Sequence, residues 1–180
     1  NKIALAHHRD DMIETLLPVA GCVYAYRHVE PAVEHPFQRE RFGIAAEVYS
    51  ATSFQQLRHD ALQAERWNRL NPDKAPRVPY VAQVLGSEGG PVVVATDWIK
   101  TLPDLVAPWA PAPYIVLGTD RSGRSDTREA LRAHFEIDAP NIAAAALSGL
   151  VRRGELDPGA AAAAIRDLGL DPDGPDALTA

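Results

Sequence analysis

The run of residues 91–96, PVVVAT, constrains the fold more than any other part of the sequence. Its three consecutive valines favour a strand, because β-branched side chains pack well on a pleated surface. No polar side chain interrupts the run before Thr96, so we expect this strand to be covered on both faces. Residues 114–118, YIVLG, repeat the same signal.

Capping residues indicate where the helices begin. Ser53 lies three residues before Gln56, as in a capping box. Apolar residues then follow at three- and four-residue steps, which predicts an amphipathic helix that ends at Asn71-Pro72. Further helices are expected at residues 78–85 and after Asp97, Asp126, Asp138 and Asp157.

The order of these elements predicts the architecture. A strand expected at residues 45–49 opens a series in which strands alternate with helices, and three helices close the chain. That order favours a parallel α/β sheet covered on both faces, with right-handed crossovers. Residues 18–40 fit it least, because Pro31 and Pro36 break any long helix. We therefore expect a poorly defined segment at residues 1–40 and one domain at residues 41–180.

Composition and charge exclude several classes of protein. A net charge of −6 gives no sign of a nucleic-acid or anionic-membrane surface. Cys22 is the single cysteine, which excludes an internal disulfide and a cysteine-built metal site. No apolar run approaches the ~20 residues that span a bilayer, and the N-terminal residues lack a signal-peptide pattern. We expect a cytoplasmic protein, and a fragment or processed product because the chain begins with Asn1 rather than methionine.

Four long segments resemble a known family. They are EVYSATSFQQLRHDAL, ERWNRLNPDKAPRVPYVAQVL, PVVVATDWIK and YIVLGTDRSGRSDTREALRAHFEID, in this order along the chain. Over about residues 41–180 the chain closely resembles the C-terminal domain of the homodimeric, thiamine-diphosphate-dependent first component of bacterial pyruvate dehydrogenase complexes. The resemblance implies the transketolase C-terminal fold, a three-layer α/β/α sandwich with a mostly parallel five-stranded sheet.

The resemblance also implies where the chemistry of such an enzyme lies. In that family thiamine diphosphate and magnesium sit between two other domains, so this chain is expected to bind no cofactor and to be inactive alone. Its expected role is assembly and subunit contact within an oxidoreductase that decarboxylates pyruvate. The implied partners are a second copy of the chain, the catalytic domains of the same enzyme and the acyltransferase component of the complex.

Two parts of the sequence depart from that family. Arg121 and Ser122 replace the Gly-Phe of its usual GTDGFGRSD motif, a change expected to alter the turn and remove an aromatic contact. Residues 1–17 instead resemble the His-His-x-Asp-Asp-x-x-Glu-Thr segment of the PP-loop ATP pyrophosphatases that thiolate transfer RNA. The sequence contains neither the phosphate-binding Ser-Gly-Gly loop nor the cysteines of those enzymes.

Two groups of polar residues are weak candidates for a metal. The denser group is His7, His8, Asp10, Asp11 and Glu14. Its i,i+4 pairs share a helix face and could hold a metal, but a helix dipole attracting acids to its N-terminus is the simpler explanation. The other group is His28, Glu30, Glu34 and His35, where the surrounding prolines favour a solvated loop.

The stronger candidate for binding is the loop formed by Arg121, Ser122, Gly123, Arg124 and Ser125. It precedes a helix, so backbone N–H groups and two guanidinium groups favour an anion there. The alternative is a surface loop whose arginines pair with Asp120 or Asp126. If any part of the chain contacts a ligand or a neighbouring subunit, we expect it to be this loop, and Arg124 to matter most because it matches the motif of the family.

No catalytic residue is predicted. Ser53, His59 and Asp60 do not suggest a triad, because Ser53 is explained as a cap and nothing positions the other two. Trp67 and Trp98 are expected to be core or interface anchors. Three functions stay open: a non-catalytic domain of a 2-oxo acid dehydrogenase, a detached interaction module or remnant, and a fusion with part of a PP-loop ATPase.

Overall fold

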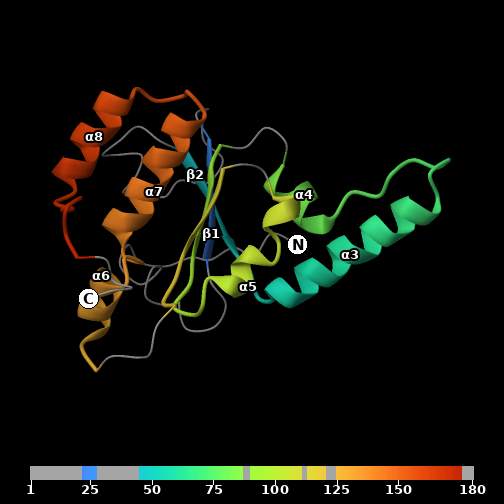
Figure 1. Ribbon diagram of the computed structural model, residues 1–180, viewed down its shortest axis with the longest axis horizontal. Coiled ribbons are helices and arrows are strands. Elements are labelled where there is room, and N and C mark those ends of the chain that lie inside the picture. Colours follow the sequence, from blue (N-terminus) through green and yellow to red (C-terminus); the bar gives the residue numbers. More distant parts are fainter. Residues whose placement is uncertain (1–21, 28–44, 87–89, 111–112, 121–124, 176–180) are drawn as a thin grey trace.

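The computed structural model describes residues 22–27, 45–86, 90–110, 113–120 and 125–175. The strands are β1 (Cys22–Arg27), β2 (Ala45–Ser50), β3 (Val92–Ala95) and β4 (Tyr114–Leu117). The helices are α3 (Phe54–Leu70), α4 (Tyr80–Leu85), α5 (Thr101–Asp104), the short 3-10 helix η1 (Ala107–Trp109), α6 (Arg128–His134), α7 (Ala139–Arg152) and α8 (Pro158–Asp167). Figure 1 shows the sheet between two helical layers, with α6, α7 and α8 on one side and α3, α4 and α5 on the other.

The described strands form one sheet in the order β2-β1-β3-β4. β3 and β4 pair in parallel, with Val92 opposite Tyr114, whereas β1 is antiparallel to both β2 and β3. The expectation of a mostly parallel five-stranded sheet is thus corrected for the described residues, which form four strands with two antiparallel pairings out of three. The apolar sequence of β3 predicts that both of its faces are buried, but it does not determine the direction of the neighbouring strand. An antiparallel neighbour therefore fits the same sequence.

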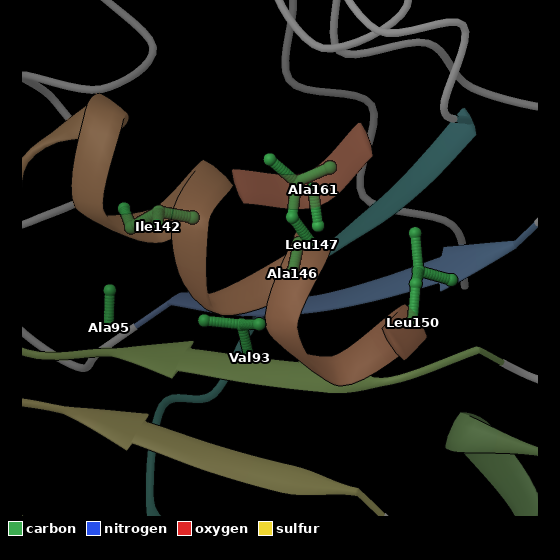
Figure 2. Close-up of a cluster of buried hydrophobic side chains, with 7 residues drawn as sticks. All are labelled: Val93, Ala95, Ile142, Ala146, Leu147, Leu150 and Ala161. Atoms are coloured by element: carbon green, nitrogen blue, oxygen red, sulfur yellow. The ribbon is translucent and has the colours of Figure 1, made fainter. Parts of the chain in front are cut away.

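β3 is the centre of the hydrophobic core, because its side chains alternate between the two faces of the sheet. Val93 and Ala95 belong to the cluster formed with α7 and α8, shown in Figure 2. Val92 and Val94 belong to the cluster on the opposite face, with residues of α3 and α4. All four side chains are fully buried, so the prediction of a strand covered on both faces is confirmed.

α7 is the helix that covers the first of these faces. It begins after Asp138, whose Oδ1 accepts a hydrogen bond from the backbone N of Asn141 at 3.1 Å, as the sequence predicts. Ile142, Leu147 and other residues of its inner face pack on β3 (Figure 2). A Cβ at Gly149 would lie 2.4 Å from Cβ of Pro91, so glycine allows the close approach of α7 to the start of β3.

The structure moves two of the predicted helix starts. Asp97 does not cap a helix, since α5 begins only at Thr101 and its preceding backbone N–H, at Lys100, donates to Oδ1 of Asp120 at 2.7 Å. α6 begins after Thr127 rather than Asp126, because the Thr127 hydroxyl accepts from the N–H of Ala130 at 3.3 Å. At α5 the carboxylate of Asp120 satisfies a free N–H, and at α6 the hydroxyl of Thr127 does so, in place of the expected Asp97 and Asp126.

β4 is less buried than its apolar sequence predicts. It lies at one end of the described sheet, paired only with β3. All four of its residues are half-buried. A strand covered on both faces and a strand at an edge share the same continuous apolar pattern, so the pattern could not distinguish them.

α3 extends away from the sheet. Phe54, Ala61 and Ala64 are buried on its inner face, but Leu70 at its end is 58% exposed. Figure 1 shows the C-terminal part of α3 and the segment that follows it projecting beyond the body of the molecule. We call residues 58–80 the arm.

Candidate subunit-contact surface

The carboxyl ends of β3 and β4 lie side by side, because the two strands are parallel and in register. Binding surfaces of open α/β sheets commonly form at this edge. Three large apolar side chains are exposed just after β3: Trp98 at 64%, Ile99 at 45% and Leu102 at 37%. We call these three residues the Trp98 surface.

Hydrogen bonds fix the backbone that carries the Trp98 surface. The N–H of Thr119 donates to the carbonyl O of Trp98 at 2.9 Å, and its hydroxyl donates to the carbonyl O of Asp97 at 3.1 Å. The N–H of Trp98 donates to Oγ1 of Thr96 at 3.2 Å. A Cβ at Gly118 would lie 2.7 Å from the carbonyl O of Trp98, so glycine permits this tight contact. The exposed apolar side chains are therefore presented on a backbone with a defined conformation.

Tyr114 connects β4 to α5, the helix that contains Leu102. Its hydroxyl donates to the carbonyl O of Pro103 at 3.0 Å. Burial raises the pKa of Tyr114 above its usual value, and the negative charge of Asp104 adds to the effect. The neutral phenol is thus the form that the folded protein holds, and it helps to position α5.

Most of the predicted site residues lie outside the described part of the chain. This applies to His7, His8, Asp10, Asp11 and Glu14, to His28, Glu30, Glu34 and His35, and to Arg121, Ser122, Gly123 and Arg124. Ser125 is described and exposed. Asp120, which directly precedes the predicted loop, is bonded to the N–H of Lys100 at 2.7 Å. Asp120 and its neighbour Thr119, which donates to the carbonyl O of Trp98, therefore lie beside the Trp98 surface.

Ser53, His59 and Asp60 each have a hydrogen-bond partner of their own. The Ser53 hydroxyl accepts from the N–H of Gln56 at 3.2 Å, and Oδ2 of Asp60 accepts from the N–H of Tyr80 at 2.7 Å. His59 contacts Gln63, with 3.3 Å between their Nε2 atoms. These hydrogen bonds do not join Ser53, His59 and Asp60 to one another.

A metal site in a protein needs several His, Cys, Asp or Glu side chains that lie close together. Across the described ranges, no three His, Cys, Asp or Glu side chains are grouped so that they could hold a metal ion. The search for membrane spans, made over the same residues, finds no helix long and apolar enough to cross a bilayer.

Sequence reasoning found part of this surface and missed the rest. It singled out Trp98 as an anchor, but it gave no role to Ile99 or Leu102. The signal was available in the sequence, since the apolar pair Trp98-Ile99 comes two residues after the end of a buried strand, behind Thr96 and Asp97. The role of Asp120 had no such signal, because its partner Lys100 is 20 residues away in the sequence.

Comparisons with known proteins agree with the fold. Residues 27–138 match the transketolase-like TK C-terminal domain family. The chain is 45% identical over 174 residues to the pyruvate dehydrogenase E1 component of Pseudomonas aeruginosa, which covers 96% of this chain and 19% of that protein. The corresponding protein of Escherichia coli K12 is 46% identical over 148 residues, covering 82% of the chain and 16% of that protein. That of Mycobacterium tuberculosis is 40% identical over 128 residues, covering 71% and 14%.

These matches confirm the family resemblance and refine it. The chain spans less than a fifth of the length of these relatives. The Pseudomonas aeruginosa match takes in most of residues 1–40, and the family match already begins at residue 27. The resemblance of residues 1–17 to PP-loop ATP pyrophosphatases has no support in these comparisons. Since the family match covers more than half of the sequence, the chain belongs to the transketolase-like C-terminal domain family.

Proposed function

We propose that this chain is the C-terminal assembly domain of a pyruvate dehydrogenase first component and contributes contact surface rather than catalytic groups. The family and the 45% identity support the enzyme class. The assembly role is carried by one observation, the Trp98 surface. Its backbone is fixed by hydrogen bonds, yet it exposes three large apolar side chains. Preorganised apolar surface of this kind favours association, because little conformational entropy is lost on binding.

In this proposal the chemistry belongs to the parts of the longer enzyme that the chain does not span. Those parts would bind pyruvate, thiamine diphosphate and magnesium and carry out the oxidative decarboxylation in the cytoplasm. The partners of this domain would be the catalytic domains of the same enzyme and a second copy of the chain, with the acyltransferase component as a further candidate. The loop from Arg121 to Ser125 would extend the Trp98 surface, with Arg124 facing a carboxylate of the partner.

A full-length chimera tests this role. The matching region of the Escherichia coli enzyme is replaced by this chain, and pyruvate turnover is measured with thiamine diphosphate and magnesium. We expect the chimera to assemble and turn over pyruvate, while the isolated 180-residue chain shows only the background rate. Turnover by the isolated chain, or a soluble chimera that does not turn over pyruvate, would contradict the proposal.

A substitution in the same chimera tests the surface itself. Trp98→Ala should weaken the assembly, because an aromatic anchor loses its contacts, and the concentration at which subunits dissociate should rise about tenfold or more. Arg166→Ala is the control, since Arg166 is also exposed but lies on α8, on the opposite side of the sheet (Figure 1). Equal dissociation of the two variants would exclude the Trp98 surface as the contact.

A further inference from the structure

The outer part of the arm, residues 67–79, is held in one shape by side-chain bonds to its own backbone, and we call it the tip. Asn68 bridges α3 and the segment that returns from it, since its Nδ2 donates to the carbonyl O of Arg77 at 2.9 Å and its Oδ1 accepts from the N–H of Arg77 at 2.7 Å. Nδ2 of Asn71 donates to the carbonyl O of Trp67 at 2.9 Å. The tip is therefore preorganised, although the arm projects beyond the body of the molecule (Figure 1).

Two cations of the tip gather on one aromatic ring. The Arg77 guanidinium lies 4.4 Å from the ring centroid of Trp67, and the Lys74 ammonium lies 5.9 Å from it. Both distances are within the range of a cation–π contact. Oδ1 of Asn71 also accepts a hydrogen bond from the Lys74 ammonium at 2.9 Å. The ring and the amide thus hold two positive charges close together, no farther apart than the sum of the two ring distances.

Both cations keep donors that a ligand could use. The Lys74 ammonium has three N–H groups, of which the bond to Asn71 uses one. The hydrogen bonds that Arg77 makes to described residues come from its backbone, so they use none of the five N–H groups of the guanidinium. Both side chains are exposed. An anion can therefore approach from solvent and accept hydrogen bonds from both cations.

The acidic side chains of the arm do not neutralise this pair. Oδ2 of Asp60 accepts from the N–H of Tyr80 at 2.7 Å, and Oε1 of Glu65 accepts from the indole Nε1 of Trp109 at 2.8 Å. Asp73 is exposed, and within the described ranges no ion pair joins it to a cation of the tip. The arm contains five lysines and arginines against these three acids, although the whole chain carries a net charge of −6. The arm is thus a locally positive region that attracts anions.

We propose that the Lys74–Arg77 pair binds a phosphate group, either free phosphate or the phosphate of a small metabolite. A phosphate monoester carries a charge of about −1.5 to −2 at pH 7 and three acceptor oxygens. The planar guanidinium can bond two of these oxygens at once, and the ammonium adds a second positive charge. A carboxylate has one charge and two oxygens, so it should bind more weakly. The inference does not depend on the assembly role proposed above, because the site lies on the arm and not on the Trp98 surface.

Calorimetric titration of the 180-residue chain tests the site. Inorganic phosphate and glycerol phosphate are each compared with acetate at one ionic strength, since salt screens exposed charges. We expect one saturable site for both phosphates and binding of acetate that is at least about tenfold weaker. Tighter binding of glycerol phosphate would indicate a metabolite as the ligand, and equal binding of the two would indicate the phosphate group alone.

Substitutions that remove one charge identify the side chains that bind. Lys74→Gln and Arg77→Gln should each weaken phosphate binding about tenfold or more, because each removes a charge-assisted hydrogen bond. Arg77→Gln keeps the two bonds to Asn68, because these use the backbone of residue 77. Arg58→Gln is the matched control, since Arg58 is exposed on the same helix but lies nine positions before Trp67. Circular dichroism of each variant first confirms the fold.

Two further measurements locate the bound phosphate. Asp73→Asn should tighten binding, because it removes the negative charge next to Lys74 in the sequence. In nuclear magnetic resonance spectra, the guanidinium Nε–H of Arg77 should shift with the dissociation constant that calorimetry gives. The proposal would be overturned by the absence of saturable phosphate binding, by acetate that binds equally well, or by Lys74→Gln and Arg77→Gln variants that bind phosphate as tightly as Arg58→Gln does.

Discussion

The β3–α7 core and the arm are both well formed, but different interactions hold them. In the core, Val93 and Leu147 are buried among other apolar side chains, with no polar contact between them (Figure 2). In the arm, Asn68 and Trp67 act through hydrogen bonds and a cation–π contact with Arg77, close to solvent. Burial of apolar area stabilises the whole domain, whereas the contacts of the arm order only the arm.

The difference indicates what each region is for. Four of the seven large apolar side chains found exposed among the described residues lie in the arm, at Leu62, Leu70, Val78 and Tyr80. The two clusters around β3 contribute none of the seven. The polar bonds instead keep the arm extended, and this leaves its apolar and cationic side chains available to a partner.

The largest expected effect separates the two regions directly. Leu147→Ala, in the core at 3% exposure, should lower the free energy of unfolding by about 2–5 kcal/mol, because it removes apolar contacts and leaves a cavity. Leu70→Ala removes the same atoms from the arm, where the side chain is 58% exposed, and should change stability by less than about 0.5 kcal/mol. Urea unfolding of both variants measures the two values. Similar losses would show that the arm is part of the cooperative core.

The fold could be predicted from the sequence where local chemistry decides it. The valines of β3, the Ser53 cap and the Asp138 cap each fix an element through contacts within a few residues. Strand direction and strand order could not be predicted, because they depend on which distant segments pair. β1 lies between β2 and β3, and nothing in its six residues indicates that position or its reversed direction.

The candidate surface was predictable only in part for the same reason. The exposure of Trp98 depends on Thr119 and Asp120, which bond to its loop from 20 or 21 residues away. The apolar steps of α3 predicted one continuous inner face through Leu70, but the body of the molecule ends before the helix does. A helix pattern records which face is apolar, and it does not record how far the neighbouring layer extends.

A smaller effect should follow from loosening the arm. Asn68→Ala removes both hydrogen bonds to the backbone of Arg77, so local opening of residues 71–79 should become easier by about 1–3 kcal/mol. Hydrogen exchange of the Arg77 amide measures this, and trypsin should cut after Lys74 sooner. Gln63→Ala is the control, because Gln63 lies on the same helix and, among the described residues, its side chain hydrogen-bonds only to His59. If global unfolding shifts as much as the local exchange, the arm and the core are one unit.

The smallest effect concerns Tyr114, whose hydroxyl joins β4 to α5 on the core side of the comparison. Burial raises its pKa in the folded protein, so the folded chain keeps this proton at pH values where the unfolded chain, with a tyrosine pKa of about 10, has released it. The folded state then binds more protons, and stability falls as the pH rises above about 10. Tyr114→Phe should lose about 0.5–1.5 kcal/mol at neutral pH, because the bond to the Pro103 carbonyl is gone. Its stability should then fall less steeply than that of the wild type between neutral and strongly alkaline pH.

Tyr80→Phe, the control, removes an exposed hydroxyl from the arm and should follow the wild-type curve. Urea unfolding across this pH range gives all three curves, and parallel curves for the wild type and Tyr114→Phe would show that the Tyr114 proton does not contribute to the stability of the core.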